Sequence, residues 1–154
     1  MKARSNTCIA VVEDTDGLLV MAADRRISFE GGAYQKAPVS KINKRNGVIL
    51  GGSGHGFICS LLVDQMPIPE INEDNTVDYM FNTFIGQVIV YLRNLGVVHP
   101  TELRLIDSMS NPNHVYETGI LIVLDSRVYG LSLSKECISL DMLSAPYAVG
   151  CGGD

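Results

Sequence analysis

Two charged side chains lie beside apolar segments and carry groups that amide hydrolysis can use. Asp24 directly follows an apolar run, and Lys41 comes immediately after Ser40 at the start of another. A lysine near a carboxylate and a hydroxyl can lower the proton affinity of a nucleophile in lysine-assisted or amine-assisted hydrolysis. Charged residues at the ends of buried strands are often only solvated termini. The pattern leaves both interpretations open.

Glycines surround Ser53 and His55 in the segment 51–56. This segment lies between an apolar run typical of a strand and a periodic run typical of a helix, so its amides would suit an anion or a developing oxyanion. Close packing of the strand against the helix explains the same glycines equally well. No Gly-Lys-Ser/Thr follows, which argues against a phosphate-binding loop.

The remaining reactive side chains give no sign of a metal site. The three histidines lack metal-ligand spacing, and no Gly-x-Ser-x-Gly motif is present. The four cysteines are scattered without a CxxC pair, so we expect Cys8, Cys59 and Cys137 to be reduced and mostly buried. We therefore expect neither a metal nor a cofactor.

Composition restricts the class of protein. A chain of 154 residues that is 46% hydrophobic fits one domain. Its net charge of −5 and pI near 5.1 offer no basic surface for nucleic acid or an anionic membrane. No apolar run approaches the roughly 20 residues that span a bilayer, and no signal peptide is evident. We expect a cytoplasmic protein without a nucleic-acid or membrane partner.

The elements that would position these groups follow from periodicity and turn chemistry. The runs 7–12 and 18–23 predict a hairpin buried on both faces, and Asn46-Gly47 predicts a tight turn between 40–44 and 48–52. A helix is predicted from 55 until Pro67 stops it. Further strands are predicted at 119–124, 128–133, 137–140 and 147–149.

The clearest helix covers residues 77–95, where apolar residues recur at i, i+3, i+4 and i+7. Asn75 or Thr76 can cap its start, and Gly96 can end it. The order of strands, helices and again strands predicts an α+β fold with helices layered on antiparallel sheet.

Five sequence blocks in a fixed order resemble proteasome β subunits and bacterial HslV. They are Thr-Cys-Ile-Ala-Val-Val, Gly-Leu-Leu-Val-Met-Ala-Ala-Asp-Arg-Arg-Ile-Ser, Ser-Lys-Ile, Val-Ile-Leu-Gly-Gly-Ser-Gly and Ala-Val-Gly-Cys-Gly-Gly. The resemblance covers residues 7–154 and makes 1–6 an N-terminal extension or propeptide. It implies the αββα sandwich of N-terminal-nucleophile hydrolases, incomplete at the C-terminus because the last helices and strands of the family are absent.

The resemblance also assigns catalytic roles. Thr7 matches the nucleophile, whose hydroxyl attacks a peptide carbonyl while its freed α-amine takes the proton. Asp24 and Lys41 match the residues that orient and activate this threonine. Gly52 matches the glycine whose amide forms the oxyanion hole. Cys151 occupies the position of a serine that assists the nucleophile, and a thiol is a weaker hydrogen-bond donor.

Substrate-binding positions are implied in the same way. Ser28 matches a residue that binds the substrate backbone as an added strand. Val39, Leu50 and Gly54 would line the pocket for the residue before the scissile bond. The implied function is a threonine-type peptidase subunit, in a ring of like subunits, that receives unfolded protein or peptide from an ATP-dependent unfoldase.

Two alternatives depend on departures from the family pattern. Asn6 precedes Thr7 where the family has a glycine. A chain that retains residues 1–6 would be a catalytically silent structural subunit, because Thr7 would lack a free amine. Cleavage one residue later would expose Cys8 and favour a hydrolase of small amides on the same fold.

Overall fold

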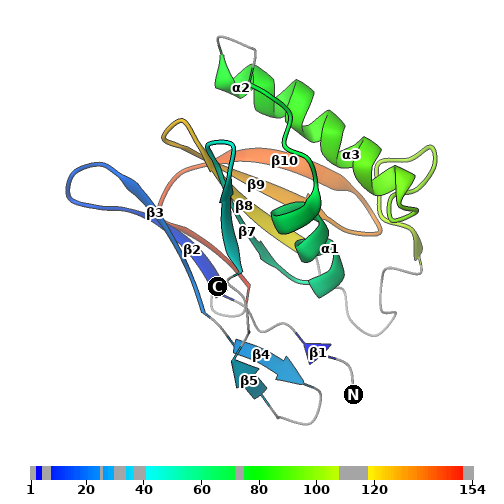
Figure 1. Ribbon diagram of the computed structural model, residues 1–154, viewed down its shortest axis with the longest axis horizontal. Helices are drawn as coiled ribbons and strands as arrows, with labels where there is room; N and C mark the ends of the chain where they lie inside the picture. Colours follow the sequence, from blue (N-terminus) through cyan, green and yellow to red (C-terminus); the bar gives the residue numbers. More distant parts are fainter. Residues whose placement is uncertain are drawn as a thin grey trace.

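The computed structural model describes residues 3–4, 8–24, 26–29, 34–36, 41–71, 75–107 and 118–150, with the backbone alone for 3–4, 26–29 and 34–36. Helices lie over one face of a five-stranded sheet, and a smaller sheet lies against the opposite face (Figure 1). This segregation confirms the predicted α+β class. The finer prediction of an αββα sandwich goes beyond what these layers establish.

The five-stranded sheet is antiparallel throughout, with the strand order β10-β9-β8-β7-β6. Positive φ angles at Asn46 (51°) and Gly47 (80°) form the predicted tight turn between β6 and β7. Asp125 (51°) and Ser126 (58°) make the equivalent turn between β8 and β9. The strands are β6 (Ile42–Arg45), β7 (Val48–Ser53), β8 (Thr118–Leu124), β9 (Arg127–Leu133) and β10 (Ile138–Leu143).

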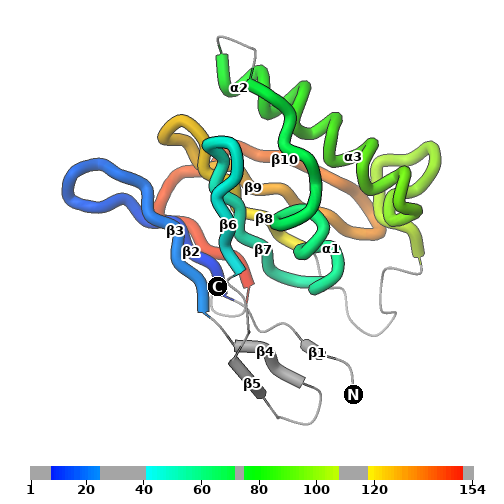
Figure 2. The backbone as a smooth tube through the Cα atoms, in the orientation of Figure 1, coloured from blue at the N-terminus to red at the C-terminus, as the bar shows by residue number. Residues whose placement is uncertain are grey.

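The second sheet joins distant parts of the chain, because β11 (Tyr147–Gly150) pairs with β2 (Cys8–Glu13), which pairs with β3 (Leu19–Ala23). Figure 2 shows β11, in red, beside β2, in blue. Ile9 on its inner face is fully buried against the five-stranded sheet. Val12 and Val20 on its outer face are each 45% exposed. The prediction that this hairpin is buried on both faces is therefore wrong.

The helical layer contains two helical runs with π-helical turns. In the first run, Met66 N donates to Leu61 O at 2.7 Å, an i→i−5 bond. The second run begins as predicted at Asn75, whose side chain accepts from Val77 N at 2.9 Å, and Gly96 follows its end with φ 74°. The segments are α1 (Gly56–Ser60), η1 (Leu61–Gln65), α2 (Thr76–Asp78), η2 (Tyr79–Phe84) and α3 (Ile85–Asn94).

The larger core lies between these helices and the five-stranded sheet. Its biggest side chains, including Tyr79, Phe84 and Leu92 from the helices, pack against residues such as Leu50 and Ile120 of the sheet. Burial of this apolar surface is the main source of stability for the layered arrangement. Within the described helices, none is long and apolar enough to cross a membrane.

A third, short sheet has the order β1-β4-β5 and was not predicted. The first strand, β1 (Ala3–Arg4), pairs antiparallel with β4 (Arg26–Phe29), so that Arg4 lies opposite Ser28. The other neighbour of β4 is β5 (Tyr34–Lys36). The start of the chain is therefore paired with the strand that contains Ser28.

Candidate active site

Asp24 and Lys41 form an ion pair that joins the two larger sheets. Asp24 directly follows β3 and Lys41 directly precedes β6. Lys41 Nζ lies 2.6 Å from Asp24 Oδ1, with the lysine side chain 13% exposed and the aspartate side chain 37% exposed. Hydrogen bonds between two charged groups are shorter and stronger than neutral ones. The structure thus brings together two residues that the sequence assigned to one site.

The other oxygen of this carboxylate is directed at the start of β2. Cys8 N donates to Asp24 Oδ2 at 3.0 Å, and Asp24 N donates to Cys8 O at 3.1 Å. Asp24 therefore binds both Lys41 and the residue that follows Thr7 in the sequence. Thr7 itself lies outside the described residues.

Gly52 lies in β7 beneath helix α1, in a space that admits no side chain. A Cβ atom at this position would lie 2.9 Å from Cys59 Sγ and 2.9 Å from Ile120 Cδ1. Real Cβ atoms do not approach other heavy atoms so closely, and a glycine inside a strand marks such an approach. The close strand-to-helix packing considered for the glycine segment is therefore present.

The amide of Gly52, predicted to stabilise an oxyanion, has a weak partner within the chain. Gly52 N donates to Lys41 O at 3.4 Å, a long distance for an N–H···O hydrogen bond. An oxyanion near this amide would have to share or replace that bond. The same contact holds the backbone of Gly52 close to that of Lys41.

Cys59 of helix α1 lies beside Gly52, close enough to Lys41 to feel its charge. Burial raises the pKa of the Cys59 thiol to about 12, while the positive charge of Lys41 acts in the opposite direction. The half-buried thiol is therefore neutral near pH 7, which makes it a poor nucleophile. Strand glycines at positions 51 and 52 indicated a close neighbour, but no sequence signal identified it as Cys59.

The turn after β7 is held by Thr118, a residue that the sequence analysis did not identify. Gly54 has φ 119°, in the region that favours glycine, and ends the strand. His55 N donates to Thr118 Oγ1 at 3.1 Å, and Thr118 is 1% exposed. The glycine segment is thereby tied to the first residue of β8.

The structure describes some of the remaining predicted site residues and not others. Ser28 is described by its backbone alone, opposite Arg4. Leu50 is 1% exposed and lies in the helix-side core, so its side chain is not accessible to a peptide in this structure. Val39 and Cys151 lie outside the described residues, as does Thr7.

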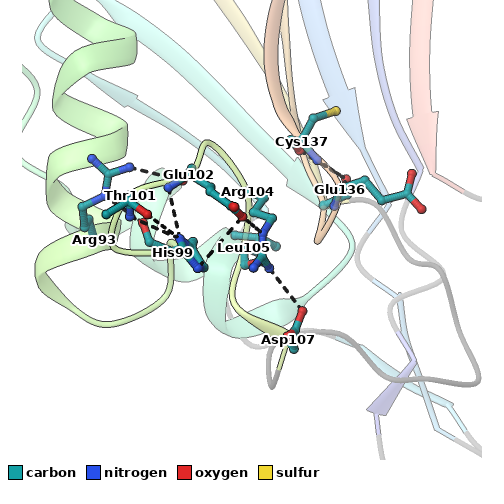
Figure 3. Close-up of polar contacts among 10 residues, drawn as sticks. Arg93, His99, Thr101, Glu102, Arg104, Leu105, Asp107, Glu136 and Cys137 are labelled. Atoms are coloured by element: carbon teal, nitrogen blue, oxygen red, sulfur yellow. Dashed lines mark hydrogen bonds and ion pairs between the residues drawn. The ribbon is translucent and has the colours of Figure 1, made fainter.

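A second polar cluster closes the loop after α3 (Figure 3). Arg93 Nε donates to His99 O at 2.8 Å, and His99 Nδ1 accepts from Thr101 N at 3.2 Å and Glu102 N at 3.1 Å. Arg104 donates a hydrogen bond to Glu102 and thereby lowers the pKa of that carboxyl group. These groups bind one another within the loop. We therefore interpret the cluster as a structural clasp and not as an active site.

No group of three or more His, Cys, Asp or Glu side chains in the described ranges could hold a metal ion. The ion pair and the adjacent glycine amides can supply a positive charge, a carboxylate and backbone donors. The free thiol of Cys8 lies in the residue whose amide binds Asp24.

Comparison with known proteins identifies the class of fold. No protein-family model matches the chain, and no curated protein matches it. The fold is nevertheless shared with solved structures. One is BPH from Thiobacillus denitrificans in complex with epoxomicin, with a TM-score of 0.64 and 18% identity over 96% of this chain and 73% of that one.

A second structure of Thiobacillus denitrificans BPH has a TM-score of 0.58 and 19% identity, again over 96% of this chain and 73% of that chain. At these identities the similarity establishes a common fold. It does not assign the activity of the neighbour to this chain.

Proposed function

We propose that this chain is a threonine-type peptidase subunit of a ring-forming protease of the proteasome β-subunit and HslV family. Thr7 is the nucleophile once residues 1–6 have been removed. The substrates are peptides or unfolded protein, supplied to a ring of like subunits by an ATP-dependent unfoldase, and the protein is cytoplasmic.

One observation carries this proposal. The Asp24 carboxylate holds Lys41 Nζ at 2.6 Å and the amide of Cys8 at 3.0 Å. Cys8 is covalently bonded to Thr7, so this arrangement supports a site in which a carboxylate and an ammonium group flank the nucleophile. An ion pair that served only to join two sheets would not need the additional hydrogen bond from the amide of Cys8 to Asp24.

The reaction follows from these groups. The α-amine of processed Thr7 takes the hydroxyl proton as Oγ bonds to the substrate carbonyl carbon. The oxyanion forms near Gly52 N and the positive charge of Lys41. When the C–N bond breaks, the leaving amine takes the proton and an ester remains on Thr7. Water then attacks this ester, the α-amine again transferring the proton, and releases the carboxylic acid.

The comparison and the surface give further support. BPH, which shares the fold, was solved in complex with epoxomicin, so that protein binds this ligand. The outer face of β2 and β3 carries Val12 and Val20, each 45% exposed. A second helical layer would bury these side chains, as the αββα sandwich of N-terminal-nucleophile hydrolases requires.

The test combines N-terminal sequencing with peptide hydrolysis. We expect purified active protein to begin at Thr7 and Thr7→Ala to abolish hydrolysis. Lys41→Ala should reduce kcat at least about 100-fold, as loss of transition-state electrostatics does elsewhere. Lys44→Ala is the matched control, because Lys44 is an exposed residue of β6, the strand that Lys41 directly precedes. Full activity of Thr7→Ala would refute the proposal.

A second candidate is a catalytically silent structural subunit. The pairing of Ala3–Arg4 with β4 favours it, because that contact requires residues before Thr7 to be retained. A ring whose chains begin at Met1 and hydrolyse no peptide would support this candidate. Titration calorimetry with epoxomicin adds a second way to distinguish the peptidase from the silent subunit. We expect a chain that begins at Thr7 to bind epoxomicin and a chain that begins at Met1 not to bind it.

A further inference from the structure

Thr118 presents a buried hydroxyl to the turn that follows Gly52. The residue is 1% exposed, and its Oγ1 accepts the backbone N–H of His55 at 3.1 Å. A buried hydroxyl is stabilising only when it is hydrogen-bonded. The two residues are far apart in sequence, so this contact fixes the position of one segment relative to another.

The contact lies where β7 leaves the sheet. The last paired residues of β7 and β8 are Ser53 and Gly119. Gly54 then turns the chain with φ 119°, and His55 becomes the N-cap of α1 without a side-chain cap of its own. The side chain of Thr118 thus binds the backbone just beyond the last paired residues of the two strands.

We propose that Thr118 is a positioning residue for the peptidase reaction. It fixes residues 54–55 immediately after the ladder of β7 and β8. Gly54 is a proposed pocket residue, and the proposed oxyanion donor Gly52 lies two residues earlier in β7. This inference rests on the proposed function. Its physical basis is that donor amides act on the transition state only when they are held in position, and small displacements are costly in rate.

The kinetic test uses the full chain in its native assembly. Thr118→Val keeps the shape and removes the acceptor, and Thr118→Ser restores it. We expect Thr118→Val to lower kcat about ten-fold or more with KM changed less than about two-fold, and Thr118→Ser to recover most of kcat. Thr76→Val is the matched control, because Thr76 Oγ1 donates to Asp125 Oδ2 at 3.0 Å beyond the other end of β8.

A structural readout separates this inference from the proposed function. Hydrogen–deuterium exchange of the His55 amide should be about five-fold faster in Thr118→Val, because a hydrogen bond is lost, and unchanged in Thr76→Val. Unchanged exchange, or an unchanged kcat in Thr118→Val, would overturn the role of Thr118. Absence of Thr7-dependent hydrolysis in the wild type would instead refute the proposed function, and exchange alone would then decide whether Thr118 fixes this segment.

Discussion

Replacing Gly52 with alanine should destabilise the protein by a predictable amount. The added Cβ would lie 2.9 Å from Cys59 Sγ, 2.9 Å from Ile120 Cδ1 and 3.0 Å from Cys59 Cβ. Comfortable carbon contacts are about 3.5–4.0 Å, so each contact is short by several tenths of an ångström or more. Cys59 Cβ is fixed to the backbone and cannot rotate away. Overpacking of this kind costs about 1–3 kcal/mol.

An opposing effect must be subtracted. Alanine restricts the unfolded chain more than glycine does, which stabilises the folded state by about 0.4–1 kcal/mol. The midpoints of these two ranges, about 2 and about 0.7 kcal/mol, leave an expected net loss of about 1.3 kcal/mol in the free energy of unfolding. For a domain of this size, that loss lowers Tm by roughly 3–5 °C.

Thermal and urea unfolding, followed by circular dichroism, would measure this loss. Gly86→Ala is the matched control, because no atom lies within 4 Å of a Cβ built there. In helix α3 that substitution should stabilise by about 0.5–1 kcal/mol. Cys59→Ala should restore part of the stability in the Gly52→Ala background. If Gly52→Ala were as stable as the wild type, the packing argument would be wrong.

Two further predictions concern titration and reactivity. Because Arg104 lowers the pKa of Glu102 in the folded state, the stabilisation from this carboxylate is present above its unfolded pKa of about 4.3 and is lost as pH falls through the folded pKa. The stability difference between the wild type and Glu102→Gln, measured by urea unfolding, should shrink between about pH 6 and pH 3; a constant difference would contradict this. The Cys59 thiol, with a pKa of about 12, should resist iodoacetamide at about pH 8 in the folded protein while the exposed Cys137 is alkylated. Peptide mass spectrometry would detect both, and equal labelling of the two thiols would refute the burial of Cys59.

Local chemistry made much of the fold predictable. Asn46-Gly47 forms a tight turn because both residues tolerate positive φ, and the observed angles are 51° and 80°. The long helical period of 77–95 and its cap at Asn75 act within a few residues, so they can be read from the sequence. Features of this kind depend little on distant parts of the chain.

Long-range packing accounts for the failures. The run 18–23 is apolar throughout, yet Val20 is exposed because only one face of its sheet meets the core. Leu50 belongs to an equally apolar run, and its burial beneath the helices depends on which face of β7 they cover. The strands β4 and β5 cover only four and three residues, too few for an alternating pattern to stand out from the surrounding sequence. No sequence pattern indicated the π-helical turns.

In the candidate site, too, some residues could be predicted from the sequence and others depend on long-range packing. Asp24 and Lys41 could be proposed as partners from strand ends and a family resemblance, and the structure brings them to 2.6 Å. Thr118 could not be proposed, because its hydrogen bond to His55 spans 63 positions. The expectation of mostly buried cysteines is wrong for Cys137, which is exposed beyond the end of β9, while Cys8 and Cys59 are half-buried. The contact of Cys59 with Gly52 depends on how α1 crosses β7.

The pairing of β1 with β4 links removal of residues 1–6 to the exposure of one edge of β4. Residues 3–4 precede Thr7, so cleavage of the bond between Asn6 and Thr7 would separate β1 from the polypeptide that contains β4. Loss of β1 would leave β4 with β5 on one side and an unpaired edge on the other. Unpaired edges readily accept another extended segment. Under the proposed function, one proteolytic event would thus create the α-amine of Thr7 and open an edge of β4 to an added strand at the same moment.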